Sequence, residues 1–171
     1  PVPTKVLIPI IQNASCEDND ELQDRWSALL ANAANPDSHP GVPPSLPEIH
    51  KQISSTDARF LDYLFEAALA KSYEDALQYG LCYDNTVKAD LGTLQHLDSE
   101  YVALNGTRDG FSMTLENLTR LGLLIPRMII RSVSDKQRVY TGEAAEEHFL
   151  FSVIAYNFVR ACRKPSPSQE I

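Results

Sequence analysis

The residues whose types could catalyse a reaction or bind a metal are scattered along this sequence. The closest group is His96, Asp98 and Glu100, spaced two residues apart. Side chains at this spacing share one face of a strand but not of a helix, and this stretch has the pattern of a helix end. We therefore interpret the group as a solvated acidic cluster, and predict neither a metal site nor a catalytic acid–base pair.

The cysteines and the glycines offer no recognisable reactive motif either. Cys16, Cys82 and Cys162 match neither a disulfide framework nor a zinc-binding pattern. Cys162 falls on the apolar stripe of the expected last helix, which favours a small core residue over a nucleophile. The sequence contains no glycine-rich phosphate loop and no His-Glu-x-x-His motif. We expect a protein without enzymatic activity, catalytic residues, metal or cofactor.

A second kind of chemistry, contact with nucleic acid, has better candidates. Asparagine and arginine can read base edges, and cations on a neighbouring hairpin can contact phosphates. The candidates are Asn117 and Arg120 on an expected helix, and Arg127, Arg131, Lys136 and Arg138 around an expected hairpin. Glu116 on the same helix would meet phosphate unfavourably. These six residues are the predicted site, with double-stranded DNA or a protein as its partner.

Charge is distributed unevenly over the 171 residues, whose net charge is −8. Residues 1–107 hold 6 basic and 16 acidic side chains, whereas residues 108–164 hold 9 basic and 6 acidic ones. This asymmetry indicates two functional surfaces, one of which could face an anionic partner. It is equally consistent with a mildly basic half that docks on an acidic half.

Composition places the chain among ordinary globular proteins. Hydrophobic residues make up 43% and charged residues 22% of the sequence, which excludes disorder over most of its length. The longest apolar run, residues 6–11, is too short to span a bilayer, so we expect no membrane contact and a cytoplasmic location. Because the chain begins at Pro1 rather than Met, we expect that further residues precede it. The oligomeric state is left open.

The elements that must position the candidate residues are mostly helices. Apolar residues recur at helical spacing behind a cap at residues 18–21, with Trp26 as the expected core anchor. Ser54 and Asp57 are expected to cap the next long helix. We expect further helices at 4–15 and 46–53, from about residue 84 through Leu97, from a cap at Ser112 to Gly122, and at the end of the chain.

Extended segments are expected only in the second half, at 123–130, 138–140 and 149–153, with a polar turn at 132–137. Helix, strand, charged turn, strand and helix is the order of a winged helix. The predicted fold is therefore mainly α-helical with a small β-hairpin. We expect an acidic helical region at 1–98, packed on a winged-helix-like region at 99–164, and a frayed tail at 165–171.

Four segments resemble the Abi-alpha family of bacterial proteins, which are linked to abortive infection, a defence against phage. Residues 22–33 resemble its "L-x-x-x-W-x-x-L-L-A-N-A" helix, and residues 48–58 its "E-I-x-x-x-L-S-x-x-D-A" stretch. Residues 117–123 resemble "N-L-x-R-L-G-L", and residues 158–162 the closing "F-x-x-A-C". The sequence departs from the family at residue 155, where Ala stands in place of Gly in the turn before the last helix.

The resemblance implies a context, defence against phage, but carries no catalytic or binding residues over to this chain. Combined with the charge distribution, it favours a non-enzymatic sensor that recognises a protein or a nucleic acid through its second half. The alternative is a winged-helix transcriptional regulator that binds DNA.

Overall fold

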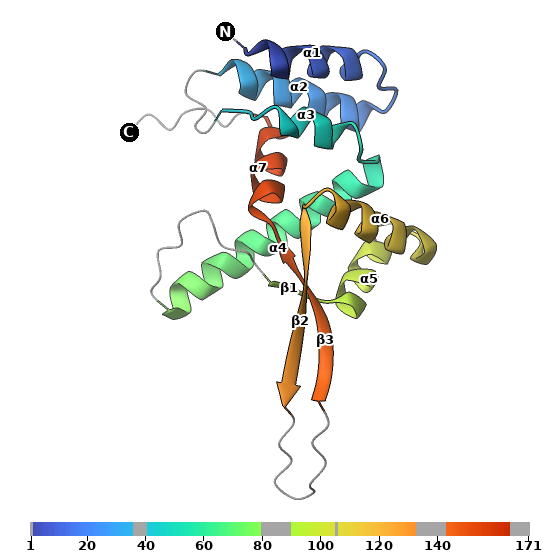
Figure 1. Cartoon of the computed structure of the whole chain (residues 1–171), viewed down its shortest axis with the longest axis vertical. Helices are drawn as coiled ribbons and strands as arrows, with labels where there is room; N and C mark the ends of the chain where they lie inside the picture. Colours follow the sequence, from blue (N-terminus) through green and yellow to red (C-terminus); the bar gives the residue numbers. More distant parts are fainter. Residues whose placement is uncertain (1, 36–40, 80–89, 105, 133–142, 165–171) are drawn as a thin grey trace, which may run out of the picture. The chain divides into compact units, whose positions relative to one another are not determined.

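The computed structural model describes residues 2–35, 41–79, 90–104, 106–132 and 143–164, and it is mainly helical with a small antiparallel sheet. Figure 1 shows the order of the elements. They are α1 (Thr4–Ala14), α2 (Asp20–Ala34), α3 (Ser45–His50), α4 (Ser55–Tyr79), β1 (Asp90–Thr93), α5 (Leu94–Ala103), α6 (Arg108–Arg120), β2 (Leu124–Ser132), β3 (Glu143–Phe151) and α7 (Val153–Ala161). The predicted mainly helical class with a hairpin is confirmed. None of the helices in these segments carries an apolar stretch long enough to cross a membrane.

The chain divides into two compact units, whose boundaries lie inside α4 and α7. Unit 1 comprises Pro1–Asp62 and Tyr156–Ile171, and unit 2 comprises Tyr63–Ala155. The division expected from sequence, at residue 98, stays a prediction.

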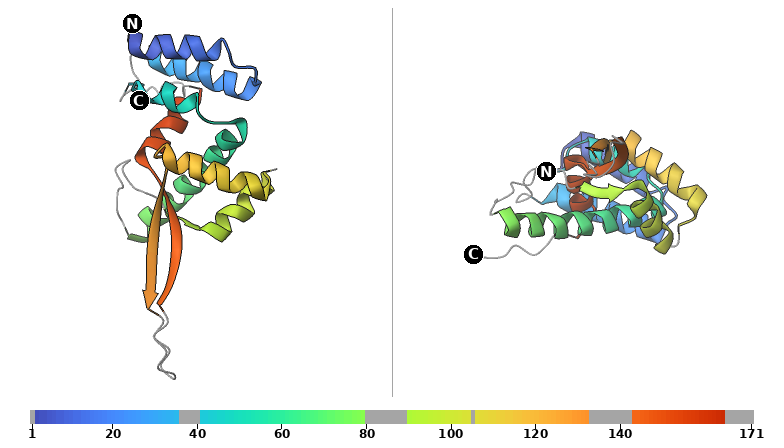
Figure 2. Two further views of the ribbon diagram at one scale, coloured as in Figure 1. Left: turned by 45° about the vertical axis from the view of Figure 1, so that its right-hand side comes forward. Right: turned by 90° about the horizontal axis from the view of Figure 1, so that it is seen from below.

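Unit 1 is built around the helix that carries Trp26. Trp26 is 1% exposed, which confirms the predicted core anchor. Helix α1 lies alongside α2 in both views of Figure 2. Burial of each large apolar side chain here contributes about 1.5–3 kcal/mol. The fully buried core includes Ile10, Trp26, Leu29, Phe60, Leu61 and Phe158.

Hydrogen bonds between side chain and backbone fix the helix ends of unit 1. The Ser54 amide donates to the Asp57 carboxylate at 2.9 Å, and the Asp57 amide donates to Ser54 Oγ at 3.1 Å. This reciprocal pair confirms the predicted start of α4. At the end of α7, Asn32 Nδ2 of α2 donates to the carbonyls of Ala161 and Arg163, at 2.9 and 2.8 Å. The Ala161 carbonyl is among those that a helix end leaves without intrahelical partners, and Arg163 lies two residues beyond the helix.

Unit 2 holds a three-stranded antiparallel sheet in the order β1-β3-β2. The hairpin register pairs Leu124 with Phe151 and Ser132 with Glu143. Strand β1 corrects the helix expected from about residue 84. Residues 84–89 lie outside the described residues, but Asp90–Thr93 are extended and pair with β3. The helix begins only at Leu94, where Thr93 Oγ1 accepts from the His96 amide.

The hairpin differs from the expected one in its second strand and in one described side chain. Strand β3 begins at Glu143 rather than at residue 149, and Val153, expected to be extended, begins α7. His148 follows two glutamates in the sequence, which is a surface pattern, yet it is only 6% exposed. It lies on β3 between its pairing partners Thr93 and Arg127, so both neighbouring strands shield it. The expected turn at 132–137 and strand at 138–140 lie almost wholly outside the described residues.

Candidate functional site

Helix α6 carries two of the six residues of the predicted site, Asn117 and Arg120. It begins five residues earlier than expected, because Thr107 rather than Ser112 is its cap and Thr107 Oγ1 accepts from the Gly110 amide at 3.1 Å. Its end was predicted correctly. Gly122 has a φ of 71°, and the Leu123 amide donates to the Leu118 carbonyl at 2.9 Å, which is a Schellman motif.

The inner face of α6 fixes its rotation about the helix axis. Phe111, Thr114 and Leu118 are at most 5% exposed. Thr114 Oγ1 shares a hydrogen bond of 3.1 Å with the hydroxyl of Tyr101 on α5, and the rings of Tyr101 and Phe111 lie 5.5 Å apart. A Cβ at Gly106 would lie 2.1 Å from the Tyr101 ring, so the turn between the two helices requires glycine. These contacts hold the opposite face of α6 in a fixed orientation.

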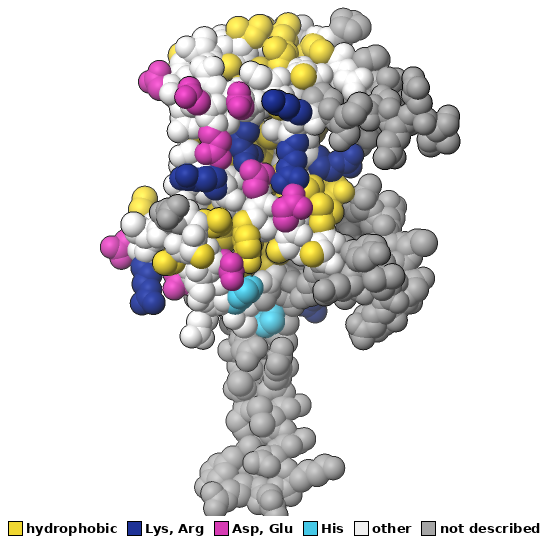
Figure 3. Space-filling model, turned by 180° about the vertical axis from the view of Figure 1, so that it is seen from behind, with side chains coloured by type: hydrophobic (Ala, Val, Ile, Leu, Met, Phe, Trp, Pro, Cys, Tyr) yellow, Lys and Arg dark blue, Asp and Glu magenta, His cyan; other side chains and the backbone are white. Residues whose placement is uncertain are grey.

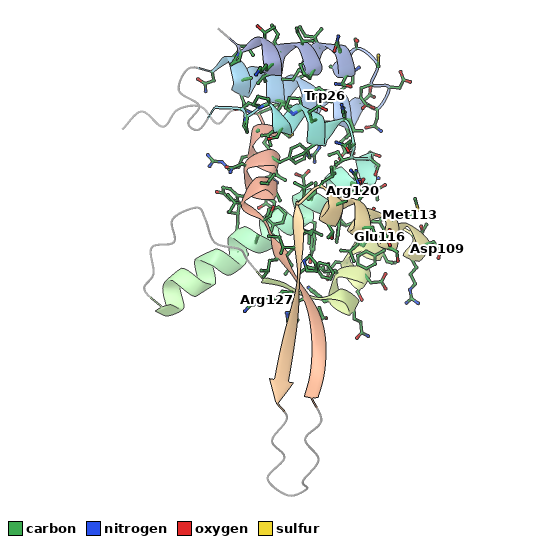
Figure 4. The ribbon with its side chains drawn as sticks, in the orientation of Figure 1. Trp26, Asp109, Met113, Glu116, Arg120 and Arg127 are labelled. Atoms are coloured by element: carbon green, nitrogen blue, oxygen red, sulfur yellow. The ribbon has the colours of Figure 1, made fainter. Side chains whose placement is uncertain are left out.

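Four of the six exposed side chains of α6 form a narrow row along the helix. Asp109, Met113, Glu116 and Arg120 fall within about 60° of one another at 100° per residue. Met113 is 74% exposed, the largest exposed fraction among the described large hydrophobic residues. We call these four residues the α6 row. Figure 4 labels them along the helix.

The structure brings two of the six predicted residues together. Arg120 Nη2 donates to Asn117 Oδ1 at 2.7 Å. Arg127 is exposed on β2, opposite His148, and Figure 4 shows it at the sheet rather than along α6. The backbone of Arg131 pairs with Ala144. Lys136 and Arg138 lie outside the described residues.

The charges of the α6 row are mixed. Two carboxylates and one guanidinium line it, so a phosphate backbone laid along this row would meet more negative than positive charge. Arg108, also exposed on α6, lies outside the row. Figure 3, which shows the molecule from behind relative to Figure 1, shows acidic and basic side chains interspersed over the described surface.

Unit 1 contains an ion pair between a buried arginine and a partly exposed aspartate, which no sequence pattern indicated. Arg25, 6% exposed, pairs with the Asp62 carboxylate and donates to the Ala58 carbonyl at 3.1 Å. Arg163 approaches the other Asp62 oxygen at 3.5 Å. A pocket of about 230 Å³ adjoins this pair. Its walls carry three acidic and three basic side chains: Glu21, Asp24, Asp62, Arg25, Arg163 and Lys164.

His50 is the second buried polar group of unit 1. Its ring stacks on Trp26 with the ring centroids 4.1 Å apart and meets Phe158 edge-on at 6.0 Å. Neither ring nitrogen has a hydrogen-bond partner in another described residue. Burial, with a smaller effect from the charge of Arg25, lowers the pKa of His50 from 6.5 to about 4. The ring is therefore neutral at physiological pH.

The sequence candidates for metal or nucleophilic chemistry remain apart from one another. Within the described segments, no group of three His, Cys, Asp or Glu side chains is placed to hold a metal. Asp98 instead faces Arg108, at 3.8 Å. Cys162 is 5% exposed, and burial raises its pKa to about 12. Because the thiolate is the reactive form, this cysteine is a core residue, as predicted.

Comparison with known protein families gives a match that covers almost the whole chain. The family model described as abortive infection alpha matches residues 1–162. This confirms the resemblance found in the four sequence segments. No match was found among curated proteins or among solved structures.

Proposed function

The chain belongs to the abortive infection alpha family, which implies a role in defence against phage, and within that role we propose that it is a non-enzymatic recognition component. In this proposal unit 2 is a winged-helix module, and the α6 row binds a protein partner. Binding there is the event that the defence system senses. The observation that carries the proposal is the mixed, methionine-centred row on the outer face of α6.

The order of elements in unit 2 supports the winged-helix assignment. Helix α4, strand β1, helices α5 and α6, and the hairpin β2–β3 follow one another as in that fold, with β3 between β1 and β2. In such modules the second helix of the helical pair, here α6, enters the DNA groove or presents the binding surface. Fold alone does not decide which ligand it takes.

The composition of the α6 row favours a protein over DNA. Methionine and arginine are enriched at protein interfaces, and the flexible apolar Met side chain adapts to a partner surface. Met113 lies between acidic neighbours, with Arg120 at the end of the row. Asp109 and Glu116 would be placed against phosphates in a groove-bound helix, which is unfavourable.

Phage challenge tests this proposal. Bacteria that express the protein in its native gene context are infected, and plating efficiency is compared between wild type and Met113→Lys. We expect Met113→Lys to raise plating toward the level of cells that lack the gene, because a charge replaces the central apolar contact.

Gln12→Lys is the matched control, because Gln12 is an exposed residue of α1 in unit 1 and receives the same new side chain. It should protect as wild type does. Full protection by Met113→Lys would contradict the proposed role of the α6 row.

Recognition of DNA is the second candidate, favoured by the exposed Arg127 on the hairpin. Arg131, Lys136 and Arg138 follow it in the sequence. Fluorescence anisotropy with a mixed-sequence duplex would compare wild type with the variant Arg131→Ala/Arg138→Ala at low and moderate salt. Binding that weakens steeply with salt and is lost in the variant would favour this candidate. Absence of binding at low salt would exclude DNA recognition as a candidate function.

A further inference from the structure

The α6 row is self-complementary when two copies of the helix run antiparallel. Asp109 and Arg120 are equally far from the midpoint between Thr114 and Leu115, and so are Met113 and Glu116. A two-fold axis at that midpoint therefore places Asp109 of one copy opposite Arg120 of the other, twice. Parallel helices would instead place like charges opposite each other.

We propose that the protein partner of the α6 row is a second copy of this chain, bound through α6 in an antiparallel, two-fold arrangement. This inference rests on the proposed role of α6 as the protein-binding face. Two-fold interfaces of this kind use the same patch on both copies, and the α6 row meets that requirement through its own sequence.

The geometry of the helix supports simultaneous contact along the row. Asp109 and Arg120 lie about 16 Å apart along the axis at 1.5 Å per residue. Both charged pairs therefore form at the two ends of one straight seam. Met113 of each copy lies near the centre, about 4.5 Å from its equivalent along the axis, so the two methionines meet on one side of the seam.

The two Glu116 side chains meet on the other side of the seam at the same axial spacing. Like charges at this separation oppose each other, so they limit the strength of pairing. A seam of one 13-residue helix from each copy, about 20 Å long, buries less surface than a standard stable interface. The pairing should be weak and reversible, with dissociation constants on the order of 10–100 μM.

Sedimentation velocity across about 5–500 μM protein, a range that brackets weak interfaces, tests the inference. Asp109→Arg and Arg120→Asp each place like charges opposite one another at both ends of the seam. Each variant alone should dimerise at least about tenfold more weakly than wild type. An equimolar mixture of the two should associate like wild type, because every end then pairs Arg with Asp.

The mixture also controls for folding, because a variant that failed to fold could not restore association with the other. Glu116→Gln supplies an independent arm, and it should strengthen dimerisation because it removes the central repulsion. A wild-type protein that stays monomeric throughout the range would overturn the inference. So would a mixture that associates no better than either variant alone.

The two proposals fail separately. If the mixture does not associate but Met113→Lys still abolishes protection against phage, α6 binds a different protein and the proposed function stands. If the mixture associates but Met113→Lys protects fully, self-pairing stands and the proposed function falls.

Discussion

Protonation of His50 should make unit 1 markedly less stable in mild acid. In the fold, this ring is 1% exposed and stacked on Trp26, and its pKa is about 4 instead of 6.5. In the unfolded chain the ring regains its ordinary pKa of about 6.5. Between these two values the unfolded state binds a proton that the folded state does not, so unfolding becomes easier as pH falls.

The sign and size follow from linkage. The full stability is present above the unfolded pKa, and it is lost at about 1.4 kcal/mol per pH unit as the pH falls toward 4. This amounts to about 2 kcal/mol at pH 5 and about 3 kcal/mol in the limit. For a urea dependence of about 2 kcal/mol per M, the midpoint at pH 5 should fall by about 1 M relative to pH 7.5.

Urea unfolding monitored by Trp26 fluorescence measures this directly, because Trp26 is the single tryptophan and contacts the His50 ring. His50→Phe keeps an aromatic ring against Trp26 but cannot be protonated. This variant should lose about 2 kcal/mol less than wild type between pH 7.5 and pH 5. His96→Gln, at an exposed position of α5, should behave as wild type. Equal pH dependence in wild type and His50→Phe would refute the argument.

Two further substitutions test the Arg25–Asp62 ion pair and the left-handed conformation of Gly122. Asp62→Asn leaves the buried Arg25 without its carboxylate and should lower the free energy of unfolding by about 1–3 kcal/mol in the same urea assay. The exposed Asp24→Asn should change it little, and an equal loss in both would contradict the role of the ion pair. Gly122→Ala meets no neighbouring atom but must adopt a φ of 71°, so it should lower unfolding stability by about 1 kcal/mol. A thermal melt unchanged from wild type would contradict this.

Local signals predicted the structure best where the deciding contacts are close in sequence. The Ser54–Asp57 capping pair and the left-handed Gly122 each depend on residues within one helical turn. The apolar stripe that contains the buried Trp26 depends on periodicity alone. All three features therefore lie in the structure as the sequence predicts.

Features that depend on distant partners were missed. Leu91, Leu94 and Leu97 have helical spacing, yet pairing with β3 draws Leu91 into strand β1. Arg25 lies beside Trp26 in the sequence and resembles a solvated charge, but its partner Asp62 is 37 residues away. His50 likewise shows its stacking on Trp26 only once α2 and α3 have packed. Such contacts leave no periodic trace in a single sequence.

The helix start at Thr107 changes the interpretation of the whole candidate site. With a cap at Ser112, Asp109 would belong to a turn, and the helix would present Asn117 and Arg120 as base-reading residues with one unfavourable Glu116. The observed start adds five residues to the helix and brings Asp109 onto the same row as Arg120. An acidic residue at one end and a basic residue at the other make the row self-complementary, which a helix of the expected length could not be. The preference of our proposal for a protein over a nucleic-acid partner, both of which the sequence left open, thus rests on one capping threonine, whose hydroxyl accepts from the Gly110 amide.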